Sequence, residues 1–241
     1  MKQPVRNMYQ ENVKSINWFV GCGHDCIYCK PSFQRQMKRQ KNHCLRCFNY
    51  QPHDHLERLL QAPPKTSGLD FVFFPSSGDP AYANQKEWQV AIDYTWKHPE
   101  TTFLIQSKDP LVAFALKKFP DNVILDVTIE TNLLSFHIPS CKYEYYSDIS
   151  RAPYPMQRLT DFMKVEHKRK AVTIEPILDF GDKFASFLKP LNPEFIYVGY
   201  DNHNCFLPEA SLMETLKLID KLKNFTEVRL KTIRPAWWEN E

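Results

Sequence analysis

The sequence lacks any apolar run long enough to span a bilayer, which takes about 20 residues, although 43% of its 241 residues are hydrophobic. The N-terminal stretch MKQPVRNMYQENVKS also lacks the apolar segment of a secretory signal peptide. We therefore expect a cytoplasmic protein with a sizeable core and no membrane partner. Few stretches resemble an interdomain linker and no repeat is present, so we expect one domain over residues 1–241.

Disulfide bonds are not expected in a chain without an export signal, because the cytosol keeps thiols reduced. The seven cysteines are better explained as metal ligands or reactive thiols.

The net charge of +3 does not by itself exclude any class of binding partner. Acidic residues are absent, however, from one basic cluster, which consists of Lys30, Arg35, Lys38, Arg39 and Lys41. A second cluster consists of Lys164, His167, Lys168, Arg169 and Lys170. Such clusters either attract a phosphate backbone or form a solvated face.

Short apolar segments alternate with amphipathic ones along the chain. The apolar segments are rich in β-branched and aromatic residues and are bounded by turn formers, which predicts strands. These strands are expected near residues 16–21 and at 71–74, 101–106, 122–130, 171–177, 195–200 and 227–231. Helical spacing of apolar residues is found at 85–98, 109–119, 154–167 and 208–224.

Strand–helix alternation implies parallel strands joined by crossover helices. The predicted fold class is α/β, a partial (open) TIM-type (β/α) barrel with about six parallel strands. Chemistry in such folds takes place at the C-terminal ends of the strands. The polar residues that directly follow each apolar run are therefore the candidates for a site.

Three cysteines follow the first predicted strand in the segment CGHDCIYC, where Cys22, Cys26 and Cys29 have the spacing C-x-x-x-C-x-x-C. Three thiolates on one loop can ligate three irons of a 4Fe–4S cluster. The fourth iron is then free to chelate a small molecule through an amine and a carboxylate. A structural zinc usually shows paired C-x-x-C or His ligands, so the cluster is the preferred interpretation over zinc or unrelated thiols.

This spacing, with Tyr28 just before the last cysteine, resembles the radical S-adenosylmethionine (SAM) superfamily. The resemblance implies an enzyme that cleaves SAM reductively at the 4Fe–4S cluster. The resulting 5′-deoxyadenosyl radical would abstract hydrogen from an organic substrate. It also implies an external electron donor of the flavodoxin or ferredoxin type. Whether the enzyme is a lyase, an isomerase or a transferase stays open.

The segment SSGDP after the strand at 71–74 resembles the Gly-Gly-Glu segment that holds the SAM amino group in that superfamily. Gly78 and Asp79 take the corresponding places. Because Asp replaces Glu, the backbone carbonyls of Ser76 or Ser77 are alternative partners of the amino group. Asp79 could instead cap an ordinary strand-to-helix turn.

Further strand ends resemble the spore photoproduct lyase-like branch and its phage-encoded relatives. The similar segments are LIQSKDP (104–110), DVTIETN (126–132), SRAPYPMQR (150–158) and TIEPIL (173–178). The resemblance implies further cofactor-binding residues at these strand ends, namely Ser107, Lys108, Glu130, Asn132, Ser150, Arg158 and Glu175. Chemistry supports Arg158, because an arginine pairs with a carboxylate through two parallel hydrogen bonds, although it could also be a helix-surface arginine. A carboxylate in an apolar run, such as Glu130 or Glu175, needs a partner if it is buried.

A second pair of cysteines lies in a long insertion at about residues 30–70. Cys44 and Cys47 are followed by His53 and His55. These four residues could form a tetrahedral zinc site, hold part of an auxiliary iron–sulfur cluster, or remain free. Long insertions at the active end of a barrel often act as lids or substrate-recognition elements.

The two remaining cysteines, Cys141 and Cys205, each follow a predicted strand by several residues. A thiol beside the reacting centre could donate a hydrogen atom to a product radical. The simpler interpretation is a small buried hydrophobe.

The basic clusters and the lyase-like resemblance favour DNA, RNA or a nucleotide as substrate. Two other functions compete with the radical SAM enzyme, a zinc-dependent nucleic-acid-binding protein and an iron–sulfur electron carrier.

Overall fold

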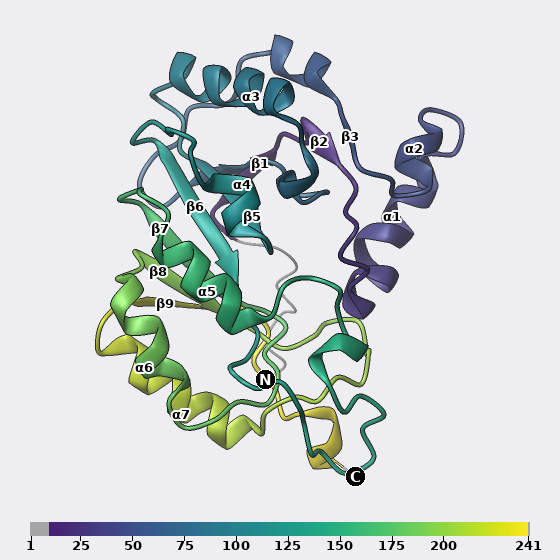
Figure 1. Cartoon of the computed structure of the whole chain (residues 1–241), viewed down its shortest axis with the longest axis vertical. Coiled ribbons are helices and arrows are strands. Elements are labelled where there is room, and N and C mark those ends of the chain that lie inside the picture. The colour runs from purple at the N-terminus through teal and green to yellow at the C-terminus, as the bar shows by residue number, and fades with distance from the viewer. Residues whose placement is uncertain (1–9, 241) are drawn as a thin grey trace.

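The computed structural model describes residues 10–240. Its main sheet contains seven parallel strands in the order β1-β4-β5-β6-β7-β8-β9, which form an open half-barrel (Figure 1). The strands are β1 (Asn12–Ser15), β4 (Phe71–Phe73), β5 (Phe103–Ser107), β6 (Val123–Thr128), β7 (Lys170–Ile174), β8 (Phe195–Val198) and β9 (Glu227–Leu230). The predicted partial TIM-type barrel is confirmed, with seven strands rather than about six.

The position of the first strand was predicted wrongly. The strand that opens the sheet is β1, whose Ser15 lies opposite Phe73 of β4. The predicted segment at 16–21 instead contains β2 (Phe19–Val20), which pairs antiparallel with β3 (His53–Asp54) in a separate two-stranded sheet. Strand β1 has the polar sequence NVKS and lies at the edge of the sheet with no buried residue, so it gives no apolar signal. Ile16 and Trp18 are buried in the core, and this explains why the segment at 16–21 has the apolar pattern of a strand.

The four predicted helices are present close to their predicted positions, as α3 (Gln85–Lys97), α4 (Pro110–Phe114), α5 (Pro155–Met163) and α7 (Leu212–Lys223). A further short helix, α6 (Phe184–Leu188), was not predicted. Helices α3 and α7 each begin at a capping box, with Asn84 and Ser211 as N-caps. Helix α4 is shorter than predicted because Leu116 adopts a left-handed conformation with φ of 62°, which ends the helix.

Short helical segments make up about half of the insertion. They are a π-helical turn (Lys30–Gln34), α1 (Arg35–Met37), a 3-10 turn (Lys38–Gln40), α2 (Leu45–Phe48) and a second 3-10 turn (Leu56–Leu60). Helices α1 and α2 stand apart from the helices that cover the sheet (Figure 1). Further 3-10 turns occupy Ile27–Cys29, Pro80–Tyr82, Tyr146–Asp148, Lys189–Leu191 and Trp237–Asn240. Within residues 10–240, no helix is both long and apolar enough to cross a membrane.

The two faces of the sheet differ in chemistry, since successive side chains of a strand point to opposite faces. One face packs against the helices in the main core, to which Ile105, Val127 and Ile174 contribute. The opposite face carries a smaller apolar cluster that includes Leu104 and Ile124. Toward the C-terminal ends of the strands this second face becomes polar. A functional site is therefore expected at this end of the sheet.

Asp126 lies on this polar face of β6 and is fully buried. Its Oδ2 atom accepts hydrogen bonds of 2.7 Å from Gln106 and of 2.7 Å from Thr173. Its Oδ1 atom has no partner among residues 10–240. Burial raises the pKa of Asp126 and outweighs the two hydrogen bonds, which lower it, so that the pKa is about 7.

We predict that Asp126→Asn changes how stability depends on pH. The folded protein keeps a proton on Asp126 up to about pH 7, whereas the unfolded chain loses it near pH 4. The folded state therefore binds more protons in this interval, and its stability falls as the pH rises, by at most about 4 kcal/mol from this group. Asp126→Asn should melt higher relative to wild type at pH 8 than at pH 5. Equal differences in melting temperature at both pH values would contradict the assignment.

Candidate functional site

The cysteine loop, residues 21–29, is joined by its backbone to the SSGDP segment. The Gly21 N–H donates to the Ser77 carbonyl at 3.1 Å, and the Asp79 N–H donates to the Gly21 carbonyl at 3.2 Å. Gly78 faces Gly21 so closely that an added Cβ would lie 2.9 Å from the Gly21 backbone. Two motifs that lie about 50 residues apart in the sequence therefore form one unit.

The other side of the cysteine loop contacts the segment that contains Ser150. The Ile27 N–H donates to the Ile149 carbonyl at 2.9 Å, and the Arg151 N–H donates to the His24 carbonyl at 2.7 Å. The Ser150 hydroxyl lies 3.0 Å from the Cys26 sulfur. The structure thus brings Ser150 to the cysteine triplet.

The three thiols of the triplet interact with one another. A hydrogen bond from Cys29 lowers the pKa of Cys26 to about 6, and the charge of Lys108 adds to this effect while burial opposes it. Burial and the charge of Asp79 raise the pKa of Cys22, whose sulfur accepts a hydrogen bond of 3.4 Å from the His24 N–H. The candidate ligands are three sulfur atoms, and the lowered pKa of Cys26 favours its thiolate form. Both features suit thiolate ligands of a metal centre.

Asp79 binds both the cysteine loop and the end of β5. Its carboxylate accepts hydrogen bonds from the Ser107 hydroxyl at 2.7 Å and from the Lys108 N–H at 2.8 Å. It also caps the turn Pro80–Tyr82 through the Ala81 N–H at 2.9 Å and lies 3.1 Å from Nε2 of His24. Asp79 is therefore a cap, as one interpretation of the sequence had it, and also a partner of the cysteine loop.

The role of His24 escaped the sequence analysis. Its ring lies between Asp79 and the Tyr82 hydroxyl, which is 3.2 Å from Nδ1. Burial would raise the pKa of Asp79, but the hydrogen bond and charge of His24 hold it below its ordinary value. The ligand atoms of Cys22, His24 and Asp79 lie within 4.8 Å of one another. A histidine between the first two cysteines was the only signal available in the sequence.

Glu130 is the centre of a buried charge network and is 0% exposed. Its carboxylate accepts hydrogen bonds from Lys108 at 2.5 Å, from the Tyr28 hydroxyl at 2.6 Å and from Arg158 at 2.6 Å. Tyr146 adds a hydroxyl at 3.2 Å. Burial would raise the pKa of Glu130, but the charges of Arg158 and Lys108 outweigh it and lower the pKa to about 2.

Arg158 lies inside the protein and is 0% exposed. Besides Glu130, its guanidinium donates to the Tyr146 hydroxyl at 2.6 Å and to the Thr128 carbonyl at 2.5 Å. Arg158 is therefore not a helix-surface arginine. The role in cofactor binding that the resemblance implies for Arg158 stays a prediction.

Two of the predicted residues lie at other points of the same strand edge. The Asn132 side chain accepts a hydrogen bond of 2.8 Å from the Gly181 N–H. Glu175, at the end of β7, forms an ion pair with Lys231 after β9. The described contacts of Asn132 and Glu175 do not connect them to the cysteine loop.

Cys141 and Cys205 pack around the apolar cluster that contains Cys26 and Tyr28. The Cys141 thiol donates to the Phe206 carbonyl at 3.6 Å. Burial and the charge of Asp201 raise the pKa of Cys205 to about 12, and burial raises the pKa of Cys141. Both thiols therefore keep their hydrogen at neutral pH.

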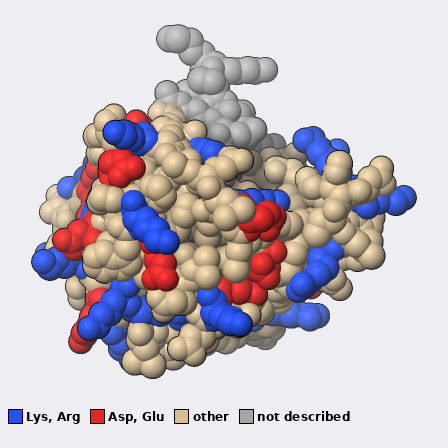
Figure 2. All heavy atoms as spheres, turned by 90° about the horizontal axis from the view of Figure 1, so that it is seen from above, with Lys and Arg blue, Asp and Glu red and all other residues tan. Residues whose placement is uncertain are grey.

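The two basic clusters differ in location. Residues 30–41 extend from the cysteine loop into the insertion, and their basic side chains are exposed. Figure 2 shows blue side chains on the lobe at the right, the side on which α1 and α2 lie in Figure 1. The second cluster instead surrounds the N-terminal end of β7, and Lys164 and Arg169 there form ion pairs with Asp161 and Glu194. Of these two clusters, the first adjoins the candidate site.

Comparisons with known proteins give no family for this chain. No protein-family model matches the sequence, and no curated protein matches it at a significant level. Among solved structures, SuiB of Streptococcus suis bound to S-adenosylmethionine is similar with a TM-score of 0.49 and 10% identity, over 90% of this chain and 50% of SuiB. SuiB bound to the precursor peptide SuiA gives a TM-score of 0.46 and 10% identity, over 90% of this chain and 48% of SuiB. This chain thus spans about half of SuiB, and similarity at this level assigns it no function.

We predict that Glu130→Gln destabilises the protein strongly. The change leaves Lys108 and Arg158 around a neutral amide, and breaking a buried ion pair on one side costs about 3–5 kcal/mol. The melting temperature should fall by roughly 6–20 °C for a chain of this size. Glu194→Gln is the control, because it breaks the more exposed pair with Arg169 and should cost at most about 1 kcal/mol. Similar losses in both variants would show that the Glu130 network is unimportant.

Proposed function

We propose that this protein is a radical SAM enzyme whose Cys22, Cys26 and Cys29 hold three irons of a 4Fe–4S cluster. The observation that carries the proposal is the cysteine loop itself. A C-x-x-x-C-x-x-C triplet with mutually interacting thiols lies at one end of an open (β/α) barrel and is tied by backbone to the SSGDP segment. When bound, cluster and SAM would supply the electron transfer that cleaves SAM and starts hydrogen abstraction from the substrate.

The protein side of this chemistry is the preparation of the thiols. Lys108 carries a positive charge that favours the ionised form of Cys26, and the Ser150 hydroxyl and the His24 N–H contact the sulfurs of Cys26 and Cys22. Because a thiolate is the form that binds iron, these groups would stabilise the ligands. Tyr28, between the last two cysteines, anchors the loop to Glu130.

The SAM amino group would be held by backbone rather than by Asp79. The Asp79 carboxylate already has four partners within the protein, and the Ser77 carbonyl accepts the Gly21 N–H. Of the two carbonyls that the sequence suggested, we therefore favour Ser76. The Ser76 N–H and hydroxyl are fixed by Asn17 at 2.7 and 3.1 Å, which would orient this peptide.

Cys141 and Cys205 are proposed as hydrogen-atom donors, because a protonated thiol near the cysteine loop has a hydrogen atom to give. The electron would come from an external flavodoxin or ferredoxin. The narrower likeness to the spore photoproduct lyase-like branch remains a prediction from sequence segments alone. An electron carrier fits less well, since carrying an electron needs no barrel.

Anaerobically reconstituted protein should contain about four irons and should release 5′-deoxyadenosine from SAM under a strong reductant. We predict that Cys26→Ala loses the iron and this activity, because the cluster loses one of its three ligands. Cys205→Ala removes a thiol outside the triplet and should keep the iron and the substrate-free cleavage of SAM. If the variant that lacks Cys22, Cys26 and Cys29 together still binds iron and cleaves SAM, the proposal is wrong.

For the substrate we propose a nucleic acid or nucleotide bound by the basic cluster at residues 30–41. Exposed Arg35, Lys38, Arg39 and Lys41 continue directly from the cysteine loop, so phosphates bound there would lie beside the site. Removing one ion pair between a basic side chain and a phosphate should reduce the slope of log affinity against log salt by about one unit on duplex DNA.

We predict that Lys38→Glu with Arg39→Glu weakens binding of DNA or RNA and leaves substrate-free SAM cleavage nearly unchanged. The matched control is Lys168→Glu with Arg169→Glu, in the basic cluster at the other end of the sheet. Binding would be measured by fluorescence anisotropy over a salt series. Absence of binding to both nucleic acids at physiological salt would favour a peptide or small-molecule substrate.

A further inference from the structure

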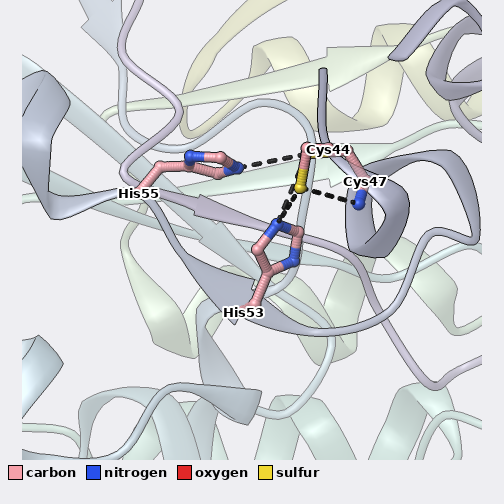
Figure 3. A group of neighbouring side chains, drawn as sticks. All are labelled: Cys44, Cys47, His53 and His55. Carbon is pink, nitrogen blue, oxygen red and sulfur yellow. Dashed lines mark hydrogen bonds between the residues drawn. The ribbon is translucent and has the colours of Figure 1, made fainter. Parts of the chain in front are cut away.

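The four potential ligands of the insertion converge on one point. Nε2 of His53 lies 3.3 Å from the Cys44 sulfur and 3.4 Å from the Cys47 sulfur, and Nε2 of His55 lies 3.1 Å from the Cys47 sulfur. All four ligand atoms lie within 4.8 Å of one another. Figure 3 shows the two rings pointing toward the cysteines. His53 belongs to β3 and His55 follows that strand, whereas Cys44 is the N-cap of α2 and Cys47 lies within this helix.

Nδ1 of each imidazole is engaged in a hydrogen bond, which leaves Nε2 available to a metal. Nδ1 of His53 lies 2.7 Å from the Gln51 carbonyl, and Nδ1 of His55 lies 2.7 Å from the Glu57 carboxylate. A carbonyl oxygen can only accept, so Nδ1 of His53 carries the proton and the neutral ring presents the Nε2 lone pair to the sulfurs. Partners of this kind orient the ligating histidines in zinc sites.

We propose that Cys44, Cys47, His53 and His55 bind one zinc ion, which holds the insertion in shape. Two sulfur and two nitrogen donors form the tetrahedral set that zinc prefers in structural sites. On binding, the two thiols release their protons to solvent and nothing is oxidised or reduced, so the site with its ion is neutral. An auxiliary iron–sulfur cluster is disfavoured, because only two cysteines are present here and Cys141 and Cys205 pack in another part of the molecule.

The ion would fix the chain that packs behind the cysteine loop. Residues 48–52 lie between the ligands Cys47 and His53, and Gly21 packs against them. Gly21 has φ of 93°, and an added Cβ would collide with the Gln51 carbonyl and lie 2.6 Å from the Pro52 nitrogen. His53 itself lies opposite Val20, two residues before Cys22.

These contacts place the segment between Cys47 and His53 against the start of the cysteine loop. The zinc-bound insertion would therefore form a wall of the candidate active site. The zinc site stands on its own geometry and does not depend on the radical SAM proposal.

Elemental analysis of the full-length protein tests the site. We expect about one zinc per chain, and a more than tenfold loss of zinc in Cys44→Ala and in His53→Ala with the iron retained. Cys205→Ala and His98→Ala are controls of the same residue types and should keep the zinc. The variant without Cys22, Cys26 and Cys29 should lose iron and keep zinc, so the two metal proposals fail independently.

A second measurement needs no variant that might misfold. Wild-type protein grown with Co²⁺ in place of zinc should show the visible absorption of tetrahedral cobalt with thiolate ligands, and added zinc should abolish it. Protease should cut zinc-depleted protein within residues 30–60 at least tenfold faster than the zinc-bound form. Wild-type protein with iron but no zinc, or equal zinc in Cys44→Ala and Cys205→Ala, would overturn the proposal.

Discussion

The buried carboxylate of Glu130 is the constraint on which the site depends. A full negative charge inside the protein requires compensation, and here it comes from Lys108 after β5 and Arg158 on α5, with hydroxyls from Tyr28 and Tyr146. These groups come from four separate parts of the chain. Because moving any of them would take a charge or a hydrogen bond away from the buried carboxylate, the network fixes the cysteine loop, through Tyr28, against the end of the sheet.

Asp79 is a second buried carboxylate that holds separate parts of the chain together. Its carboxylate joins the SSGDP segment after β4 to Ser107 at the end of β5, to Lys108 after it, and to His24 within the cysteine loop. Lys108 thus contacts both carboxylates, through its backbone to Asp79 and its ammonium to Glu130, and it also favours ionisation of Cys26. Positive charge is placed where a set of thiolates would add negative charge. This balance is why we regard the loop as a metal site rather than as three buried thiols.

Much of the fold was predictable because buried parallel strands give continuous apolar runs. Strands β4 to β8 follow that rule, whereas the two edge strands, β1 with the sequence NVKS and β9 with the sequence EVRL, do not. The cysteine triplet and the Cys44–His55 group were visible because their spacing is local. His24 was missed, and the burial of Arg158 and its contact with Tyr146 were not foreseen, because these partners lie 12 to 55 residues apart in the sequence. No local pattern encodes such pairings, which arise only when strand ends meet at one edge of the sheet.

The central claim is that three cysteines hold a four-iron cluster with one iron open to SAM. Mössbauer spectroscopy of the ⁵⁷Fe-reconstituted protein, recorded with and without SAM, tests this most directly. The account predicts that one iron of four changes its isomer shift when SAM binds, as its coordination expands, while three remain as they were. If none of the four irons changes its isomer shift when SAM is added, or if the protein holds no four-iron cluster, the claim is contradicted.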